Sequence, residues 1–413
     1  MPEPLTRDDA AALDARDPLA PFRDEFVLPE GLVYLDGNSL GALPRRTPER
    51  LREVAEGEWG RGLVRSWNAA GWIDLPARVA SRIAPLVGAT ADEVAVADST
   101  SLNLFKLLAG ALALRPGRRV VLSERENFPG DLYVAQGLSS LLGDVELRLV
   151  PRPELAGALD DSVAAMMLTH VDFRTGAAHD LRALTAQAHD AGALALWDLA
   201  HSAGALPVEL DAWQVDLAVG CGYKYLNGGP GAPAFAFVAR RWQDTFATPL
   251  SGWMGHATPF AFDTRYQPAK GVARLRCGTP PILSLAALEC GVELVASAGI
   301  GRLREKSVAL TELFVRLVEQ ECAGLGLALV SPREAARRGS QVSLRHEHGH
   351  AIVQALIARG IVGDFRAPDV LRFGVAPLYL RFTDVWDAVA GLRAVMERRE
   401  WDAAEHRRKA KVT

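Results

Sequence analysis

The 413-residue chain lacks the features of a secreted, membrane or disulfide-stabilised protein. Its four cysteines form no Cys-x-x-Cys pair and show no metal-ligand spacing. No stretch approaches the ~18 apolar residues of a membrane span. The acidic N-terminus also has no apolar core like that of a signal peptide. We therefore expect a cytoplasmic protein with no membrane partner.

The chain also lacks an excess of either charge. Its net charge is −4, and charged residues make up 23% of the sequence. This balance favours neither nucleic acid nor an anionic membrane as a partner, and we interpret the short basic stretch at 405–411 as a solvated tail. Hydrophobic residues make up 49%, an ordinary globular composition with room for a large core. We expect the partner to be a small-molecule substrate.

From about residue 90 to 240, strand-like and helix-like segments alternate. Predicted strands lie at 93–97, 119–123, 145–150, 164–168, 193–197, 215–219 and 234–238, and predicted helices at 102–114, 131–142 and 180–191. Such alternation predicts an α/β fold with a mostly parallel central sheet and helices on both faces.

The pattern of predicted elements changes after about residue 285, where long helical segments are followed by short strands. This change predicts a smaller C-terminal α+β domain. We expect residues 61–284 to form the large domain and 285–413 the small one. Residues 1–60 are expected to pack partly with the small domain.

A carboxylate and an amine follow two of the predicted strands. Asp198 comes directly after 193–197, and Lys224 follows 215–219. In α/β sheets ligands bind at the carboxyl ends of strands. Enzymes that use pyridoxal phosphate (PLP) need a lysine that binds the aldehyde and an acid that keeps the pyridine nitrogen protonated. Either residue alone is more simply a surface lysine or a turn-capping aspartate, but together they favour a PLP site.

Other residues after predicted strands suit the remaining parts of such a cofactor. Ser99, Thr100 and Ser101 precede a predicted helix, where they can bind a phosphate or simply cap the helix. Phe128 can stack on a pyridine ring, and Asp131 can cap the next helix or contact the cofactor.

Two further polar residues stand next to the central pair. His201, three residues after Asp198, can hydrogen-bond the phosphate or orient the carboxylate. Tyr223 offers a phenol that can donate to the phosphate and transfer a proton. In a crowded positive site we expect the pKa of Tyr223 to fall below its usual ~10.

The run His346, His348 and His350 leaves a metal site open as an alternative. Alternate positions on a strand point the same way, so three imidazoles there would converge. An exposed polar turn is the commoner arrangement, and no other ligand cluster supports a metal.

Taken together, these segments resemble the fold-type I, aminotransferase class V group of PLP enzymes, and within it the kynureninase family. The likeness covers nearly the whole chain and is carried by residues 34–41 (YLDGNSLG), 65–72, 128–131, 198–201, 223–227 (YKYLN), 252–256 (GWMGH) and 278–282. The Asp-x-x-His pattern and the lysine are shared across the class, whereas the three runs given in letters are more specific.

The resemblance implies a role for each matching residue. Lys224 holds PLP, Asp198 pairs with its ring nitrogen, and Phe128 stacks on the ring. The phosphate is surrounded by Thr100, Ser101, His201 and Tyr223, with Asp131 and Thr169 as further cofactor contacts. The family often has Leu-Thr where this chain has Thr100-Ser101.

The resemblance also implies a homodimer with the active site at the subunit interface. Trp253 and the segment around Thr279, where the family often has Asn, reach across from the second subunit. Arg372 receives the substrate α-carboxylate, a task that suits a guanidinium group. Trp67 lies near the place of a histidine that binds the substrate's aromatic amine in some members.

The implied activity is PLP-dependent hydrolysis of the Cβ–Cγ bond of L-kynurenine or 3-hydroxy-L-kynurenine. The products are anthranilate or 3-hydroxyanthranilate and L-alanine, within tryptophan catabolism and NAD biosynthesis, and the catalytic residues are Lys224, Tyr223 and Asp198. The alternatives are a cysteine desulfurase, epimerase or aminotransferase of the same fold, or a non-catalytic PLP-binding regulator. A desulfurase needs a reactive cysteine on a mobile loop, and Cys277 is the candidate nearest a motif.

Overall fold

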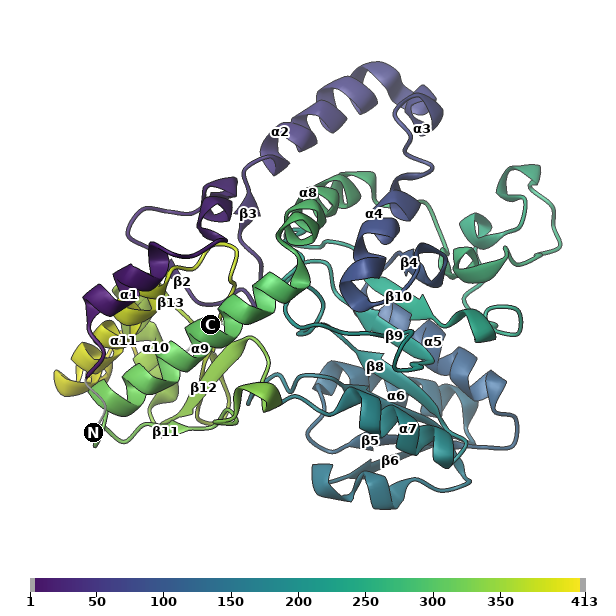
Figure 1. Ribbon diagram of the computed structural model, residues 1–413. Coiled ribbons are helices and arrows are strands. Elements are labelled where there is room, and N and C mark those ends of the chain that lie inside the picture. Colours follow the sequence, from purple (N-terminus) through teal and green to yellow (C-terminus); the bar gives the residue numbers. More distant parts are fainter. Residues whose placement is uncertain (1–3, 409–413) are drawn as a thin grey trace.

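The computed structural model describes residues 4–408 as two bodies around separate sheets. Residues 1–3 and 409–413, which include the first residues of the acidic N-terminus and the end of the basic tail, lie outside the described residues. Figure 1 shows the larger body in blue and teal, and the smaller body in purple, green and yellow. The N-terminal segment and the C-terminal part of the chain thus lie in the same body.

The larger body is built on a seven-stranded sheet in the order β4-β10-β9-β8-β7-β5-β6. Its strands are β4 (Val94–Val96), β5 (Val120–Glu124), β6 (Glu146–Val150), β7 (Val163–Thr169), β8 (Leu194–Asp198), β9 (Leu217–Gly220) and β10 (Phe235–Val238). The pairs from β6 to β9 are parallel, and only β10 runs antiparallel to both of its neighbours in this sheet. The predicted mostly parallel α/β sheet is confirmed.

Helices cover both faces of this sheet, which is why its central strands are apolar along their whole length. They are α4 (Leu75–Ile83), α5 (Thr100–Leu114), α6 (Pro129–Leu142) and α7 (Leu181–Asp190). Successive side chains of a strand point to opposite faces, so Leu196 and Trp197 of β8 belong to two different core clusters.

The smaller body holds a four-stranded antiparallel sheet in the order β11-β12-β15-β14. Its elements are α9 (Ile300–Glu321), β11 (Ala328–Leu329), β12 (Gln341–Arg345), α10 (Gly349–Ala358), β13 (Ile361–Val362), β14 (Asp364–Arg366), β15 (Val370–Gly374) and α11 (Phe382–Glu397). Before α9, the helix α8 (Ile282–Ala298) packs against α4 of the larger body.

The N-terminal segment packs with this smaller body. It contains α1 (Arg7–Asp14), β1 (Phe26–Val27), β2 (Val33–Tyr34) and β3 (Leu43–Pro44). Strand β2 pairs in parallel with β13, and α1 lies along α11. The Asp14 carboxylate accepts hydrogen bonds from the backbone N–H groups of Phe382 (2.6 Å) and Thr383 (3.1 Å), and so caps α11.

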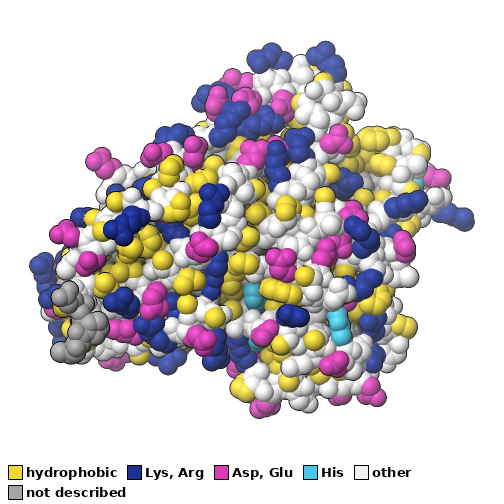
Figure 2. Space-filling model, in the orientation of Figure 1, with side chains coloured by type: hydrophobic (Ala, Val, Ile, Leu, Met, Phe, Trp, Pro, Cys, Tyr) yellow, Lys and Arg dark blue, Asp and Glu magenta, His cyan; other side chains and the backbone are white. Residues whose placement is uncertain are grey.

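Between β3 and α4 the chain forms an arm that projects at the top of Figure 1. It comprises α2 (Thr47–Arg52), a π-helical continuation (Glu53–Gly62), a short 3₁₀ turn (Leu63–Arg65) and α3 (Ser66–Ala69). Figure 2 shows basic and acidic side chains gathered at the top, over this arm. In this part of the chain Arg46 pairs with Glu53 at 2.7 Å and Arg50 with Glu58 at 2.6 Å.

Within residues 4–408, no single helix combines the length and the apolar character that a membrane crossing requires. Helices α8 and α9 meet that requirement only as a pair, and they are bent by 81° relative to each other.

Candidate active site

Three neighbouring strand ends bring the site together. Thr169 at the end of β7 is the register partner of Asp198 at the end of β8, and Leu199 donates its N–H to the carbonyl of Val219 in β9. Lys224 follows the end of β9 by four residues. The N-terminal segment closes on this turn, since the N–H of Gly41 donates to the carbonyl of Tyr223 at 2.8 Å.

Asp198 and Asp131 form a buried acid pair at the centre of the site. Both are 4% exposed, and Asp198 accepts a hydrogen bond from the N–H of Ala200 at 2.7 Å. Burial raises the pKa of Asp198, and the positive charge of Lys224 opposes that rise. Burial and the charge of Asp198 raise the pKa of Asp131, whose carboxyl oxygen also lies 3.1 Å from the hydroxyl of Thr169. A protonated Asp131 therefore supports an ionised Asp198, the state that pairs with a protonated ring nitrogen.

The aromatic side of the site is Phe128, whose ring is 42% exposed and meets Phe173 edge to face at 5.3 Å. Its position is set by Asn127, which the sequence reasoning missed. The Asn127 side-chain oxygen accepts from the N–H of Phe128 (2.8 Å) and the hydroxyl of Thr169 (2.6 Å). Its place between a strand and a Phe-Pro turn marks it as a turn residue, but gives no sign of its contact with Thr169.

The N-terminus of α5 follows the end of β4, a strand of the same sheet. Ser99 is the cap, because its hydroxyl accepts from the N–H of Leu102 at 3.4 Å. Thr100 and Ser101 form the first turn, whose backbone N–H groups have no intrahelical partner and face an anion favourably. Asp98, at φ 50°, pairs with the fully buried Lys106 beneath this turn.

The expected fall in the pKa of Tyr223 is wrong. Burial raises this pKa, and negative charge at Cys221 and Asp198 raises it further. The ammonium of Lys224 lies 5.8 Å from the centre of the Tyr223 ring, too little positive charge to reverse the effect of burial. The phenol therefore keeps its proton at neutral pH and is a donor.

His201 connects the site to the smaller body. It is 4% exposed, and burial together with the charge of Lys224 lowers its pKa well below the ordinary value, so the imidazole is neutral. Its Nδ1 lies 3.3 Å from the side-chain oxygen of Gln341 in β12. Gln341 was missed as well. A glutamine that opens an apolar strand is unusual, but its partner His201 lies 140 residues away in the chain.

Arg372 of β15 is 2% exposed and its guanidinium group is held from several sides. Its Nε donates to Asp364 at 2.7 Å, its Nη2 to Ser39 at 2.8 Å, and its Nη1 to the carbonyl of Phe173 at 2.7 Å. The charge of Arg372 contributes to the lowered pKa of His201, which places the two groups in one electrostatic environment. Asp364, which sets the plane of this guanidinium, was not found from the sequence.

The motif at 34–41 lies against this arginine. Asp36 is held close to Asp364, and burial and the charge of Asp364 raise the pKa of Asp36 to about 7. Asp36 therefore exchanges its proton near neutral pH, unlike an ordinary surface aspartate.

Three predicted site residues make their contacts elsewhere in the chain. Trp67 packs edge to face on Trp72 at 5.8 Å in the arm. Trp253 is 40% exposed and meets Phe260 at 5.7 Å, and Thr279 is exposed. Within one chain these contacts do not lead to Lys224.

The histidine run does not have the strand geometry expected of it. Strand β12 ends at Arg345, so His346 and His348 lie in the following turn and His350 is in α10. His348 stacks on Trp401 at 4.2 Å, and His350 meets Phe365 at 5.6 Å. No group of three His, Cys, Asp or Glu residues in the described part of the chain is placed to hold a metal ion.

The donor set fits pyridoxal phosphate. It combines an amine at Lys224 with a buried carboxylate at Asp198, which is supported by the protonated Asp131. An exposed aromatic ring at Phe128 and the N-terminus of α5 complete it. The amine and the carboxylate are close enough for the charge of one to shift the pKa of the other.

Comparison with known proteins finds one family model that matches part of the chain and relatives that match nearly all of it. Residues 303–392 match the family model described as the kynureninase C-terminal domain. A kynureninase from Burkholderia mallei (strain SAVP1) is 55% identical, and one from Pseudomonas fluorescens is 53% identical. Each alignment covers 99% of this chain and 100% of the relative.

Solved structures share the fold. A cysteine desulfurase from Thermococcus onnurineus NA1 has a TM-score of 0.79 and 19% identity, over 92% of this chain and 98% of its own. A C-DES mutant with glycine covalently linked to its PLP cofactor has the same TM-score and identity, over 90% and 98%. At this identity the likeness concerns the fold, which is that of the fold-type I PLP enzymes.

Proposed function

This chain belongs to the kynureninase family, and we propose that its site hydrolyses L-kynurenine or 3-hydroxy-L-kynurenine to L-alanine and anthranilate or 3-hydroxyanthranilate. The reaction is PLP-dependent hydrolysis of a carbon–carbon bond. The observation that carries this conclusion is the 55% identity along 99% of the chain to a kynureninase. The convergence of Lys224 and Asp198 supports it.

The desulfurase alternative is less supported. The desulfurase structures are only 19% identical to this chain, and a desulfurase needs a nucleophilic cysteine that can move toward the cofactor. The Cys277 thiol is half-buried and donates to the carbonyl of Leu250 at 3.3 Å. A cysteine held in this way does not suit that role.

In this proposal PLP, when bound, supplies the electron sink for the negative charge that develops at the substrate Cα. Lys224 binds the cofactor aldehyde and its amine moves the proton at Cα. Asp198 keeps the ring nitrogen protonated, with Asp131 and Thr169 behind it. Phe128 covers the ring, while Thr100, Ser101, His201 and Tyr223 surround the phosphate.

Hydrolysis requires water to add to the γ-carbonyl before the Cβ–Cγ bond breaks. A neutral phenol at Tyr223 can donate a proton to the developing oxyanion, which is the state that its raised pKa favours. When the bond breaks, the aryl group leaves as a carboxylic acid and Cβ takes a proton. The Lys224 amine then returns a proton to Cα, which completes alanine.

Arg372 receives the substrate α-carboxylate. Its Nη1 group uses one hydrogen on the Phe173 carbonyl, which leaves the other for an incoming oxygen. Asp364 and Ser39 hold the guanidinium plane in place for that contact. Trp67 is proposed as a contact to the aromatic ring of the substrate.

We further propose a homodimer that completes the site with Trp253 and Thr279 of the second copy. Exposed apolar side chains on the arm and on the 253–262 segment support it: Trp59 (58%), Leu63 (59%), Val64 (77%), Phe260 (61%) and Phe262 (77%). Apolar groups exposed together in this way are typical of an interaction surface. We place the enzyme in the cytoplasm, within tryptophan catabolism and NAD biosynthesis.

For the domains, we propose that residues 61–284 are the large one, that 285–413 are the small one, and that 1–60 pack partly with the latter. Helix α8 packs on α4 and α2, whereas α9 packs on α11. This difference in packing between consecutive helices supports a domain boundary in this part of the chain.

The test is turnover by the purified protein supplied with PLP. Adding either kynurenine should release the fluorescent aryl acid and one equivalent of alanine. Lys224→Ala should lose both this turnover and the visible absorption of the bound cofactor, whereas Lys270→Ala, at an exposed site, should keep both. Turnover with cysteine and none with either kynurenine would refute the proposal.

A further inference from the structure

A cavity of about 930 Å³ lies between the two bodies and adjoins the turn that carries Asp198. His170 and His179, which follow β7, line it from the larger body, and Arg304 of α9 lines it from the smaller one. The two bodies touch beside it, since Ala178 donates its N–H to the carbonyl of Arg337 at 2.8 Å. In Figure 1 the lime-green segment before β12 lies on the side of the smaller body that faces the larger one.

Four arginines line this cavity: Arg152, Arg182, Arg304 and Arg337. None of them forms an ion pair with a carboxylate of residues 4–408. Asp180, the one acidic residue of the lining, has its carboxylate accepting from the N–H of Ala183 at 2.9 Å as the cap of α7. The cavity therefore carries uncompensated positive charge in a chain whose net charge is −4.

Arg304 shows the imbalance most directly. Its Nη2 donates to the carbonyls of Ala335 (2.7 Å) and Arg338 (3.0 Å), while its Nη1 is buried with no hydrogen-bond partner among the described residues. A buried donor of a charged group without a partner is costly, and an anionic ligand would satisfy it.

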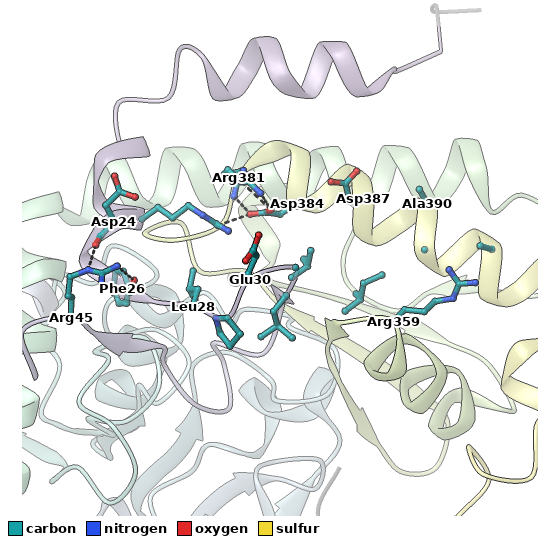
Figure 3. A pocket seen from close by; sticks show the side chains of 18 residues that line it. Asp24, Phe26, Leu28, Glu30, Arg45, Arg359, Arg381, Asp384, Asp387 and Ala390 are labelled. Carbon is teal, nitrogen blue, oxygen red and sulfur yellow. Dashed lines mark hydrogen bonds and ion pairs between the residues drawn. The ribbon is translucent and has the colours of Figure 1, made fainter. Parts of the chain in front are cut away.

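A second cavity, in the smaller body, is lined by Arg23, Arg45, Arg359 and Arg381 and is different. Figure 3 shows that Arg381 bonds Asp384 there and that Arg45 points to the carbonyls of Asp24 and Phe26. Arg359 at its other end pairs with Glu400. Arginines in that cavity already have partners, so it has no comparable demand for an anion.

Apolar side chains form the remaining wall of the cavity between the bodies, among them Leu155, Leu206 and Trp213. Positive charge combined with an apolar wall favours a ligand with both characters. Burial and the charges of His179, Arg304 and Arg152 lower the pKa of His170 to about 3, so this histidine adds a neutral imidazole.

We propose that this cavity binds a small organic anion, an apolar ring that carries carboxylate groups, and that the anion bridges the two bodies. Arg152 and Arg182 contact it from the larger body, and Arg304 and Arg337 from the smaller one. His170 links the cavity to the cofactor site. Its backbone N–H donates to the backbone carbonyl of Asp198 at 2.9 Å, and its ring Nδ1 lies 2.8 Å from the Ser202 hydroxyl.

The probe is isophthalate, titrated by calorimetry into the PLP-loaded enzyme. Arg152→Gln and Arg182→Gln should each weaken binding by about tenfold or more, since each removes one charge-assisted contact. Neither side chain forms an ion pair within the described chain, so both variants should fold and turn over kynurenine as the wild type does. Arg316→Gln, at an exposed site on α9, is the matched control and should bind normally.

Arg372→Ala separates the two sites, because an aromatic carboxylate can also enter the active site. Isophthalate should still bind this variant, and loss of its binding there would overturn the proposal. Wild-type affinity in both Arg152→Gln and Arg182→Gln would overturn it as well. Inorganic phosphate that binds as tightly as isophthalate would show that the apolar wall has no role, and would refute the ligand class.

Discussion

At the scale of single residues, burial rather than neighbouring charge decides the protonation of the site. Tyr223 stands next to Lys224, yet burial raises its pKa instead of lowering it. The same effect keeps His201 neutral and puts the proton of the acid pair on Asp131. The site therefore offers neutral donors around one ionised carboxylate.

Tyr223→Phe should lower kcat by about 100-fold or more, because the proton donor for the γ-carbonyl is lost. PLP content should stay close to that of the wild type, since Lys224, Asp198 and the other proposed phosphate contacts, Thr100, Ser101 and His201, remain. Single-turnover assays with L-kynurenine measure the effect. Tyr133→Phe, on the exposed face of α6, is the control. A kcat within about threefold of wild type would exclude the role of the phenol.

Asp36→Asn should change how stability depends on pH. The raised pKa of Asp36, about 7, means that its stabilising contribution is full below its unfolded pKa of ~3.9 and is lost as pH rises through 7. Asparagine resembles the protonated form, so the variant should gain about 1–3 kcal/mol relative to wild type between acid and mildly alkaline pH. Urea unfolding of the apoenzyme at both ends of this range measures it.

Asp364→Asn is the contrasting case. Burial works to raise the pKa of Asp364, but the hydrogen bond and charge of Arg372 lower it overall. The contribution of Asp364 to the free energy of unfolding is therefore present above the pKa that this group has in the unfolded chain. It is lost as the pH falls through the pKa that the group has in the folded protein. This variant should be less stable than wild type at neutral pH. For the Asp36→Asn prediction, curves of unfolding free energy against pH that run parallel for the variant and the wild type would contradict the environment described for Asp36.

At the scale of elements, the N-terminal segment crosses from the smaller body to close on the Lys224 turn. Gly41 makes this contact, since a Cβ there would lie 2.4 Å from the Lys224 carbonyl oxygen and 2.8 Å from the Asn227 Cα. Asn227 itself is at φ 54°, so the turn has little freedom to move away. This close approach is a physical reason for glycine at the end of the YLDGNSLG run.

Gly41→Ala should destabilise the protein by about 1–3 kcal/mol and weaken PLP binding, because the backbone of the Lys224 turn must shift. Thermal unfolding with and without PLP measures both effects. Gly137→Ala, in α6 with no heavy atom within 4 Å of the new Cβ, is the matched control. It should stabilise the helix by about 0.5–1 kcal/mol. Equal behaviour of the two variants would contradict the close approach.

At the scale of the whole molecule, one chain does not bring all the proposed residues to Lys224. Trp253 and Thr279 are exposed, and the arm presents Leu63 and Val64 to solvent. A second copy would cover these groups and supply the missing contacts, which links activity to assembly.

Val64→Asp should weaken the dimer by about 100-fold or more, because a charge would be buried without a partner. Sedimentation equilibrium measures the assembly, and the specific activity should fall in step with the dimer fraction. Leu141→Asp, 71% exposed on α6, should leave both unchanged. A fully active wild-type monomer would rule out a shared site.

The sequence by itself determined the wound sheet, most of its element boundaries within about two residues, and the placement of Asp198 and Lys224 after neighbouring strands. The spacing of apolar residues and the alternation of strands and helices are local properties of the sequence. The carboxyl ends of parallel strands meet at one edge of a sheet, however the side chains pack. Only the tertiary structure decided the sign of the Tyr223 pKa shift, the partners Asn127, Gln341 and Asp364, and the turn geometry of the histidine run. These depend on burial and on contacts between segments far apart in the chain, which no local pattern of residues encodes.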